Sequence, residues 1–218
     1  MARSFDWKAW QPQIERFLAQ RMPDGDPAHD IEHLRRVAAT ATRLAGIEEA
    51  DLEVVLPSAW LHDCVVMPKD SPLRGTASTL AAQVATDFLR TISYPGQYLQ
   101  DIHHAISAHS FSSGIEPRTL EAMVVRDADF LDALGAIGIA RCLMLGSTMG
   151  QRLYDPAEPI PGKRKPDDQR FTIDHFYIKL LRLADKIHTA SGRAEANART
   201  AFMQAFLEQF SSELADRR

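Results

Sequence analysis

The chain has 218 residues, 45% of them hydrophobic and 25% charged, which is ordinary for a globular protein with a sizeable core. Its formal net charge of −4 argues against a surface that coats duplex nucleic acid and favours a small-molecule partner. The two cysteines, Cys64 and Cys142, form no CxxC pair, so neither a disulfide framework nor a thiolate zinc site is expected. No apolar leader or run of membrane-span length is present, and we expect a cytoplasmic protein without a membrane partner.

Apolar residues recur at helical spacing through the first half of the chain. We expect helices over residues 7–22, 26–45, 51–66, 76–92 and 97–108. Asp26 and Pro27 are typical of the cap and first residue of the second helix. Pro57 should kink the third helix or mark its true start.

Histidines and cations in this half are candidates for chemistry. His62 and Asp63 lie side by side where the third helix is expected to end. The polar loop 67–75 that follows carries Lys69 and Arg74, which either meet an anion or are simply solvated. On the helix 97–108, the helical phase turns His109 inward, places His103 beside the inward face and turns His104 outward.

The second half of the chain continues the helical pattern. Residues 119–134 are apolar nearly all round, so Asp127, Asp129 and Asp132 should be buried and need partners or a metal. A short helix is expected over 139–149, an amphipathic helix over 173–187 and a last helix over 194–214. The loop 150–172 is long enough to suggest a function, and the stripe with His175 and Lys179 is either solvated or anion-binding. No convincing strand is found, and the pattern predicts an all-α protein.

His33, the His62-Asp63 pair and an aspartate near Asp129 lie on three expected helices that could converge on one ion. Imidazole and carboxylate ligands suit a divalent transition metal and leave positions for water and substrate. His62 taken alone could equally be a satisfied core residue.

The order of these residues resembles that of the HD-domain metal-dependent phosphohydrolases, whose signature is H…HD…D. Residues 29–37, HDIEHLRRV, look like the family's HDxxHxxRV opening, and residues 127–133, DADFLDA, look like its DADxLDA. Further stretches resemble the YedJ/YpgQ-type branch, and the similarity spans about 24–213: LHD at 61–63, PKDSP at 68–72, AHSFS at 108–112, GAIGIAR at 135–141 and DHFYIKL at 174–180.

The resemblance implies a single-domain, all-α HD-type helical bundle over 1–218, with a core at about 24–190 and the helices 7–22 and 194–214 packed on it. It places one divalent ion on His33, His62, Asp63 and Asp129, with Mn²⁺ favoured over Ni²⁺, Co²⁺, Fe²⁺, Mg²⁺ or Zn²⁺. Asp127 points about 200° away from Asp129 on a helix and is expected to be structural.

The resemblance also implies a hydrolase that acts on phosphoester or phosphoanhydride bonds. We expect catalytic roles for Asp63, His109, Asp132 and Lys69, and substrate contacts from Arg74, His103, His175 and Lys179. The expected substrate is a small phosphorylated molecule, in the first place a nucleotide, for a nucleoside triphosphate pyrophosphohydrolase or nucleotidase. A phosphodiesterase on a cyclic or linear diester, or a non-catalytic metal-stabilised nucleotide-binding domain, is the alternative.

Overall fold

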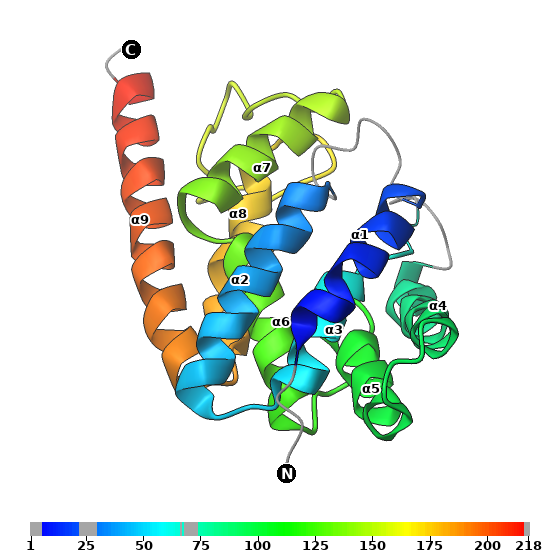
Figure 1. The fold of residues 1–218 in the computed structure, drawn as a ribbon. Coiled ribbons are helices and arrows are strands. Elements are labelled where there is room, and N and C mark those ends of the chain that lie inside the picture. Colours follow the sequence, from blue (N-terminus) through cyan, green and yellow to red (C-terminus); the bar gives the residue numbers. More distant parts are fainter. Residues whose placement is uncertain (1–5, 22–29, 66, 68–73, 216–218) are drawn as a thin grey trace. The chain divides into compact units, whose positions relative to one another are not determined.

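A computed structural model of the chain describes residues 6–21, 30–65, 67 and 74–215 (Figure 1). The regular elements of these residues are helices, and the only β pairing among them is an isolated bridge between Arg152 and Phe171. The prediction of an all-α protein is therefore confirmed. The chain divides into two compact units, 1–129 and 130–218, with the boundary inside one helix. The single domain expected over 1–218 stays a prediction.

The elements follow the order expected from the sequence. The first unit contains α1 (Gln11–Ala19), α2 (Ile31–Glu48), α3 (Leu52–Leu61), α4 (Ala77–Thr91), α5 (Leu99–His109) and most of α6 (Leu120–Asp132), with 3-10 turns η1 (Trp7–Ala9), η2 (Arg74–Thr76) and η3 (Gly96–Tyr98). The second unit contains α7 (Gly135–Thr148), α8 (Asp174–Ile178), η4 (Leu180–Arg182), η5 (Ala184–Lys186) and α9 (Ala190–Ala215).

Helix α3 is the core helix of the first unit. Every residue from Val54 to Leu61 is buried, and α3 contacts α1, α2, α4 and α5. A helix that is apolar all round is stable only when neighbours cover every face, which explains why α3 is central in the first unit. It therefore holds its last residues, where the His-Asp pair follows, in a fixed place.

Pro57 lies inside α3 and does not mark its start. Proline has no N–H, so the carbonyl of Glu53, four residues earlier, lacks its helical donor. The hydroxyl of Tyr94, in the turn after α4, donates to that carbonyl oxygen at 2.6 Å. A side chain from another element thus supplies the bond that the proline removes.

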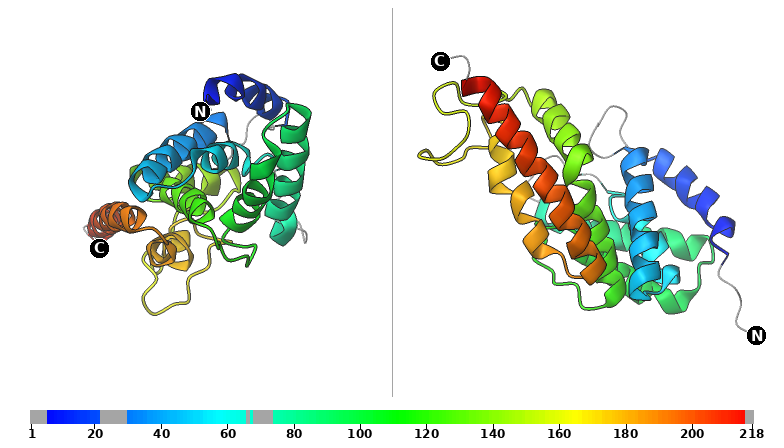
Figure 2. Two further views of the ribbon diagram at one scale, coloured as in Figure 1. Left: turned by 60° about the horizontal axis from the view of Figure 1, so that its bottom comes forward. Right: turned by 90° about the vertical axis from the view of Figure 1, so that its left-hand side faces the viewer.

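The second unit is built on α7, α8 and α9. Gly146 of α7 permits close approach of the following segment, because a Cβ added there would lie 2.1 Å from Thr172 Oγ1. Phe176 of α8 stacks on Phe206 of α9 with ring centroids 6.0 Å apart, and the two helices run side by side (Figure 2).

The segment 150–172 is ordered by its own polar contacts. Arg164 forms two hydrogen bonds to the carboxylate of Asp174, which is fully buried, and the Asp167 N–H donates to the same carboxylate at 2.6 Å. Glu158 accepts from the N–H groups of residues 162–164. Arg164 thus has a structural role.

The continuous amphipathic helix expected over 173–187 is wrong. Helix α8 ends at Ile178, the backbone at Lys179 leaves the helical region, and two 3-10 turns follow. Leu180 and Leu183 are both buried, and their spacing of three residues matches one 3-10 turn. Apolar spacing of three and four residues therefore did not distinguish the two helix types.

Within the described part of the chain, no single helix combines the length and apolar composition of a membrane span. The bent pair α6 and α7 passes that test jointly, on length and composition alone.

Candidate metal centre

His33 is held by the first turn of α2. The cap of this helix is Asp30, whose Oδ1 accepts the backbone N–H of His33 at 2.8 Å. The cap expected at Asp26 was therefore placed one turn too early, and Asp26, Pro27 and His29 lie outside the described residues. Because the capping bond ends on His33 itself, the same interaction that begins α2 positions the histidine.

His62 follows the last residue of α3 and is completely buried. Its Nδ1 lies 2.8 Å from the carbonyl oxygen of Ala59, which accepts a hydrogen bond, so the proton belongs on Nδ1. Nε2 then carries a lone pair, and it has no hydrogen-bond partner among the residues that the structure describes. A buried acceptor without a partner is costly unless a further group meets it.

His109, at the end of α5, repeats this arrangement. Its Nδ1 lies 2.6 Å from the carbonyl oxygen of Ile106, and its Nε2 lies 3.4 Å from Asp63 Oδ1. The side chain is buried, as the helical phase predicts. His104, predicted to face outward, is not part of the cluster, and its Nε2 accepts the backbone N–H of Arg118 at 2.9 Å.

The carboxylates of Asp63 and Asp129 complete the cluster. His33 Nε2 lies 3.7 Å from Asp63 Oδ2 and 3.6 Å from Asp129 Oδ1, and His62 Nε2 lies 3.5 and 3.8 Å from the same two oxygens. Ligand atoms about 2.1 Å from a common ion lie roughly 3 to 3.5 Å apart, so these separations need little adjustment to hold one.

Two overlapping sets of ligand atoms within 4.8 Å of one another result: His33, His62 and Asp129, and His62, Asp63 and His109. The side chains of Asp63 and Asp129 are 23% and 24% exposed, whereas the histidines are buried. Solvent therefore reaches the cluster from its carboxylate side. This His/Asp cluster can hold a divalent metal ion, and the orphaned Nε2 of His62 fits such an ion.

The shifted pKa values of His62 and Asp63 favour the protonation states that bind a metal ion. Burial lowers the pKa of His62 to about 4, although Asp63 and Asp129 oppose the shift, so its imidazole is neutral near pH 7. Burial acts to raise the pKa of Asp63, but the neighbouring histidines outweigh it and hold that pKa well below its usual range. A neutral imidazole and an ionised carboxylate are the forms that bind metals.

The pKa of His109 shifts the other way. Burial acts to lower it, but the interaction with Asp63 and the charge of Asp129 raise it above the usual value. His109 therefore keeps a proton at a higher pH than an ordinary histidine.

The other expected site residues are not members of the cluster or lie outside the described residues. Asp127 is fully buried on α6, as predicted for a structural carboxylate. Asp132 belongs to the second unit, where it accepts from Arg141 at 2.8 Å. Lys69 lies outside the described residues, and Arg74 is described only by its backbone in η2.

Three expected substrate contacts are on the described part of the chain. His103 lies on α5, and its Nδ1 is 3.4 Å from Ser107 Oγ. His175 and Lys179 belong to the second unit, and His175 Nδ1 lies 2.8 Å from Asp168 Oδ2. Their roles stay predictions.

A sequence profile described as "HD domain" matches residues 30–134, which include all five cluster residues. YpgQ of Bacillus subtilis (strain 168) is 31% identical over 206 residues, which are 93% of this chain and 92% of YpgQ. The chain belongs to the HD superfamily.

Solved structures agree with this membership of the HD superfamily, in the YpgQ-like branch. A Lactobacillus plantarum protein matches with a TM-score of 0.76 at 33% identity, over 98% of this chain and 100% of that one. The complex of B. subtilis YpgQ with ADP matches with a TM-score of 0.70 at 30% identity, over 94% and 96%. An HD-superfamily hydrolase from Bacillus thuringiensis matches with 0.68 at 31% identity, over 93% and 97%. These HD relatives support a hydrolase.

Proposed function

We propose that this HD protein is a metal-dependent phosphohydrolase whose substrate is a nucleotide, either as a nucleoside triphosphate pyrophosphohydrolase or as a nucleotidase. The observation that carries the proposal is the buried Nε2 of His62, which lacks a hydrogen-bond partner among the described residues and faces two carboxylates. His33, His62, Asp63 and Asp129 would hold one divalent ion there, with Mn²⁺ favoured.

The two oxygens of the Asp63 carboxylate face different members of the cluster. Oδ2 faces His33 and His62, whereas Oδ1 faces His109. When bound, a divalent ion polarises a phosphoryl oxygen and promotes ionisation of water. Asp63 links the expected metal ligands to His109, because Oδ1 orients the imidazole while Oδ2 would be available to hold the ion.

His109 is the proposed general acid. The carbonyl oxygen of Ile106 fixes its Nδ1, so Nε2 is the atom that faces the cluster. Its raised pKa favours the protonated ring, which is the form that can donate a proton to a leaving oxygen. Asp63 stabilises this protonated form through Oδ1.

The nucleotide part of the proposal draws on the relatives. YpgQ, at 30% identity over nearly the whole chain, crystallised in complex with ADP. ADP carries both a phosphoanhydride and a phosphoester, so the bond that this chain cleaves must be found by analysing products.

The test is hydrolysis of nucleoside tri-, di- and monophosphates by the full chain, with Mn²⁺, Ni²⁺, Co²⁺ or Mg²⁺, followed by product identification. Release of pyrophosphate or phosphate is expected, together with its loss in His62→Ala. His104→Gln is the matched control, because His104 lies on α5 outside the cluster and glutamine retains an acceptor for the Arg118 N–H.

Two results would contradict the proposal. Cleavage of cyclic or linear diesters in preference to every nucleotide of the panel would make the protein a phosphodiesterase. A metal-loaded protein that cleaves no phosphoester, yet melts at a higher temperature with a nucleotide, would be a binding domain.

A further inference from the structure

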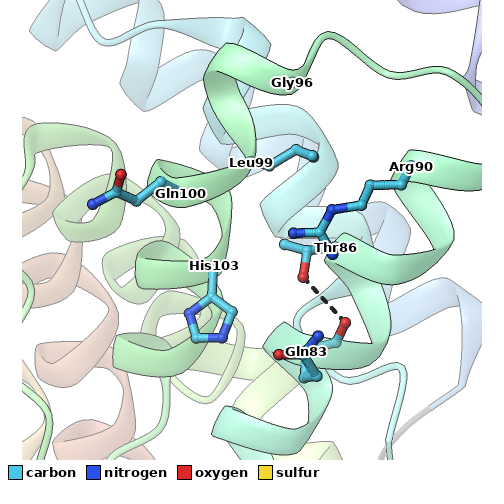
Figure 3. A pocket seen from close by; sticks show the side chains of 7 residues that line it. All are labelled: Gln83, Thr86, Arg90, Gly96, Leu99, Gln100 and His103. Atoms are coloured by element: carbon cyan, nitrogen blue, oxygen red, sulfur yellow. Dashed lines mark hydrogen bonds between the residues drawn. The ribbon is translucent and has the colours of Figure 1, made fainter.

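A groove of about 630 Å³ lies along the seam between α4 and α5 in the first unit (Figure 3). Its size is within the range of small-molecule sites. Buried Thr86 and Leu99 contribute to its lining, together with polar side chains from both helices: Gln83, Arg90, Gln100 and His103. None of these residues belongs to the His/Asp cluster.

Two polar side chains on the α4 side of the groove contact the same exposed carboxylate. One carboxylate, that of Asp87, accepts from Gln83 Nε2 at 2.8 Å through Oδ2 and from Arg90 Nη1 at 2.6 Å through Oδ1. Gln83 therefore presents its amide oxygen, an acceptor, and Arg90 presents the remaining N–H groups of its guanidinium. Figure 3 shows the Arg90 side chain extending across the groove above Thr86.

His103 supplies the opposite wall from α5. Its Nδ1 is taken by Ser107 Oγ at 3.4 Å, and its other ring nitrogen is on the side of Gln83 (Figure 3). A cationic donor, a fixed amide acceptor and an imidazole nitrogen thus border one groove. This combination matches a ligand that has an anionic oxygen at one end and an N–H or O–H group at the other.

The groove is distinct from the metal centre, although both use α5. His103 precedes His109 by six residues, which is about 9 Å along the helix and roughly 240° around it. His103 was expected to touch the phosphorylated substrate, but its neighbours in the structure are Gln83 and Ser107, which are not cluster residues.

We propose that this groove is a second binding site, which takes a small organic acid bearing a hydroxyl or amino group. The carboxylate or phosphate of the ligand pairs with Arg90, and its O–H or N–H donates to Gln83 Oε1, with His103 and Gln100 bordering the ligand. The site goes beyond the proposed hydrolase activity and does not depend on it.

The probes are 3-hydroxybutyrate, glycerol 3-phosphate and butyrate, each titrated into the full-length, Mg²⁺-loaded protein. The readout is the NMR signals of the Gln83 and Gln100 side-chain amides and of the Gly96 backbone, which also lines the groove. Saturable shifts with either hydroxylated probe are expected, and the tighter of the two identifies a carboxylate or a phosphate ligand. Butyrate, which lacks the hydroxyl, should bind about tenfold more weakly than 3-hydroxybutyrate.

A pair of matched variants tests the role of Arg90. Arg90→Gln should raise the Kd of the better probe about tenfold. Arg35→Gln is the control, because Arg35 is equally an exposed arginine paired at 2.6 Å with an acid three residues away, but on α2. It should leave the Kd unchanged. The proposal is overturned if neither hydroxylated probe gives saturable shifts, if 3-hydroxybutyrate binds but butyrate binds equally well, or if the two arginine variants bind the better probe alike.

Discussion

His62 shows how one residue can lower the stability of a protein in order to bind a ligand. Its ring is fully buried and its Nε2 lacks a protein partner among the described residues, so the cluster is less stable without an ion. The carboxylate oxygens of Asp63 and Asp129 lie 3.5 and 3.8 Å from Nε2 and offer its lone pair no donor. The burial that makes His62 costly also keeps it neutral and ready to coordinate.

A pH dependence follows for the metal-free protein. The pKa of His62 is about 4 in the folded chain, against about 6.5 when unfolded, so only the unfolded state binds this proton between those values. The free energy of unfolding contributed by His62 is therefore fully present above about pH 6.5 and is lost as the pH falls toward 4, by up to about 3 kcal/mol. Urea unfolding of chelator-treated protein across this range measures the loss.

The control for this pH dependence is His62→Gln, which cannot titrate. Subtracting its stability curve removes the opposite contribution of His109, whose pKa is raised. Parallel curves for the two proteins would show that burial does not keep His62 neutral.

At the scale of elements, α3 depends on a hydroxyl from outside the helix. Tyr94→Phe removes the hydrogen bond that the structure shows to the Glu53 carbonyl opposite Pro57. We expect a loss of about 1 kcal/mol in the free energy of unfolding, since a part-buried hydrogen bond is lost. Chemical denaturation of the metal-loaded protein measures this.

Two further variants test whether the effect of Tyr94→Phe comes from the lost hydrogen bond to Glu53 and not from altered packing of the ring. Tyr98→Phe, which alters a neighbouring tyrosine 6.4 Å from Tyr94, should change the stability little. In a Pro57→Ala background the backbone N–H of residue 57 can donate to the Glu53 carbonyl. Tyr94→Phe should then lower the free energy of unfolding by a smaller amount. An equal cost in both backgrounds would contradict the compensation between Tyr94 and Pro57.

The ion pair in the segment 150–172 gives a second prediction at this scale. Arg164→Met leaves the buried carboxylate of Asp174 without its charged partner, and we expect a loss of about 3 kcal/mol or more in thermal or urea unfolding. Lys163→Met, at the exposed neighbouring position, should have little effect. The double variant Arg164→Met with Asp174→Leu should recover part of the loss, because it removes the unpaired carboxylate although the Asp167 N–H loses its acceptor. A double variant less stable than Arg164→Met would contradict the unpaired charge as the cause.

Elements were predicted well where one face is buried and poorly where side chains decide the end of a helix. Helical phase placed His109 inward and Asp127 in the core. The start of α2 was missed because Asp26 and Asp30 are equally good caps in sequence, and only the bond to the His33 N–H distinguishes them. The break after Ile178 was missed because buried leucines three residues apart suit a 3-10 turn as well as an α-helix.

For the whole molecule, the family resemblance predicted more of the candidate site than periodicity did. It selected His33, His62, Asp63 and Asp129, and the structure brings both histidine Nε2 atoms to between 3.5 and 3.8 Å from the two carboxylates. Sequence spacing could not show that His109 shares this cluster, because α5 meets α3 only through tertiary packing. Sequence spacing also could not show that Arg164 pairs with the buried carboxylate of Asp174.

Binding of the ion should stabilise the chain unevenly. An ion that binds only the folded state adds about 2.7 kcal/mol at a concentration one hundred times its Kd. The five cluster residues lie on or directly after α2, α3, α5 and α6, and all belong to the first unit. Hydrogen exchange of the full chain with and without Mg²⁺ should therefore show slower exchange in these helices and little change in α9. His62→Ala should abolish the difference, whereas equal slowing in α9 would mean that the ion stabilises the chain only globally.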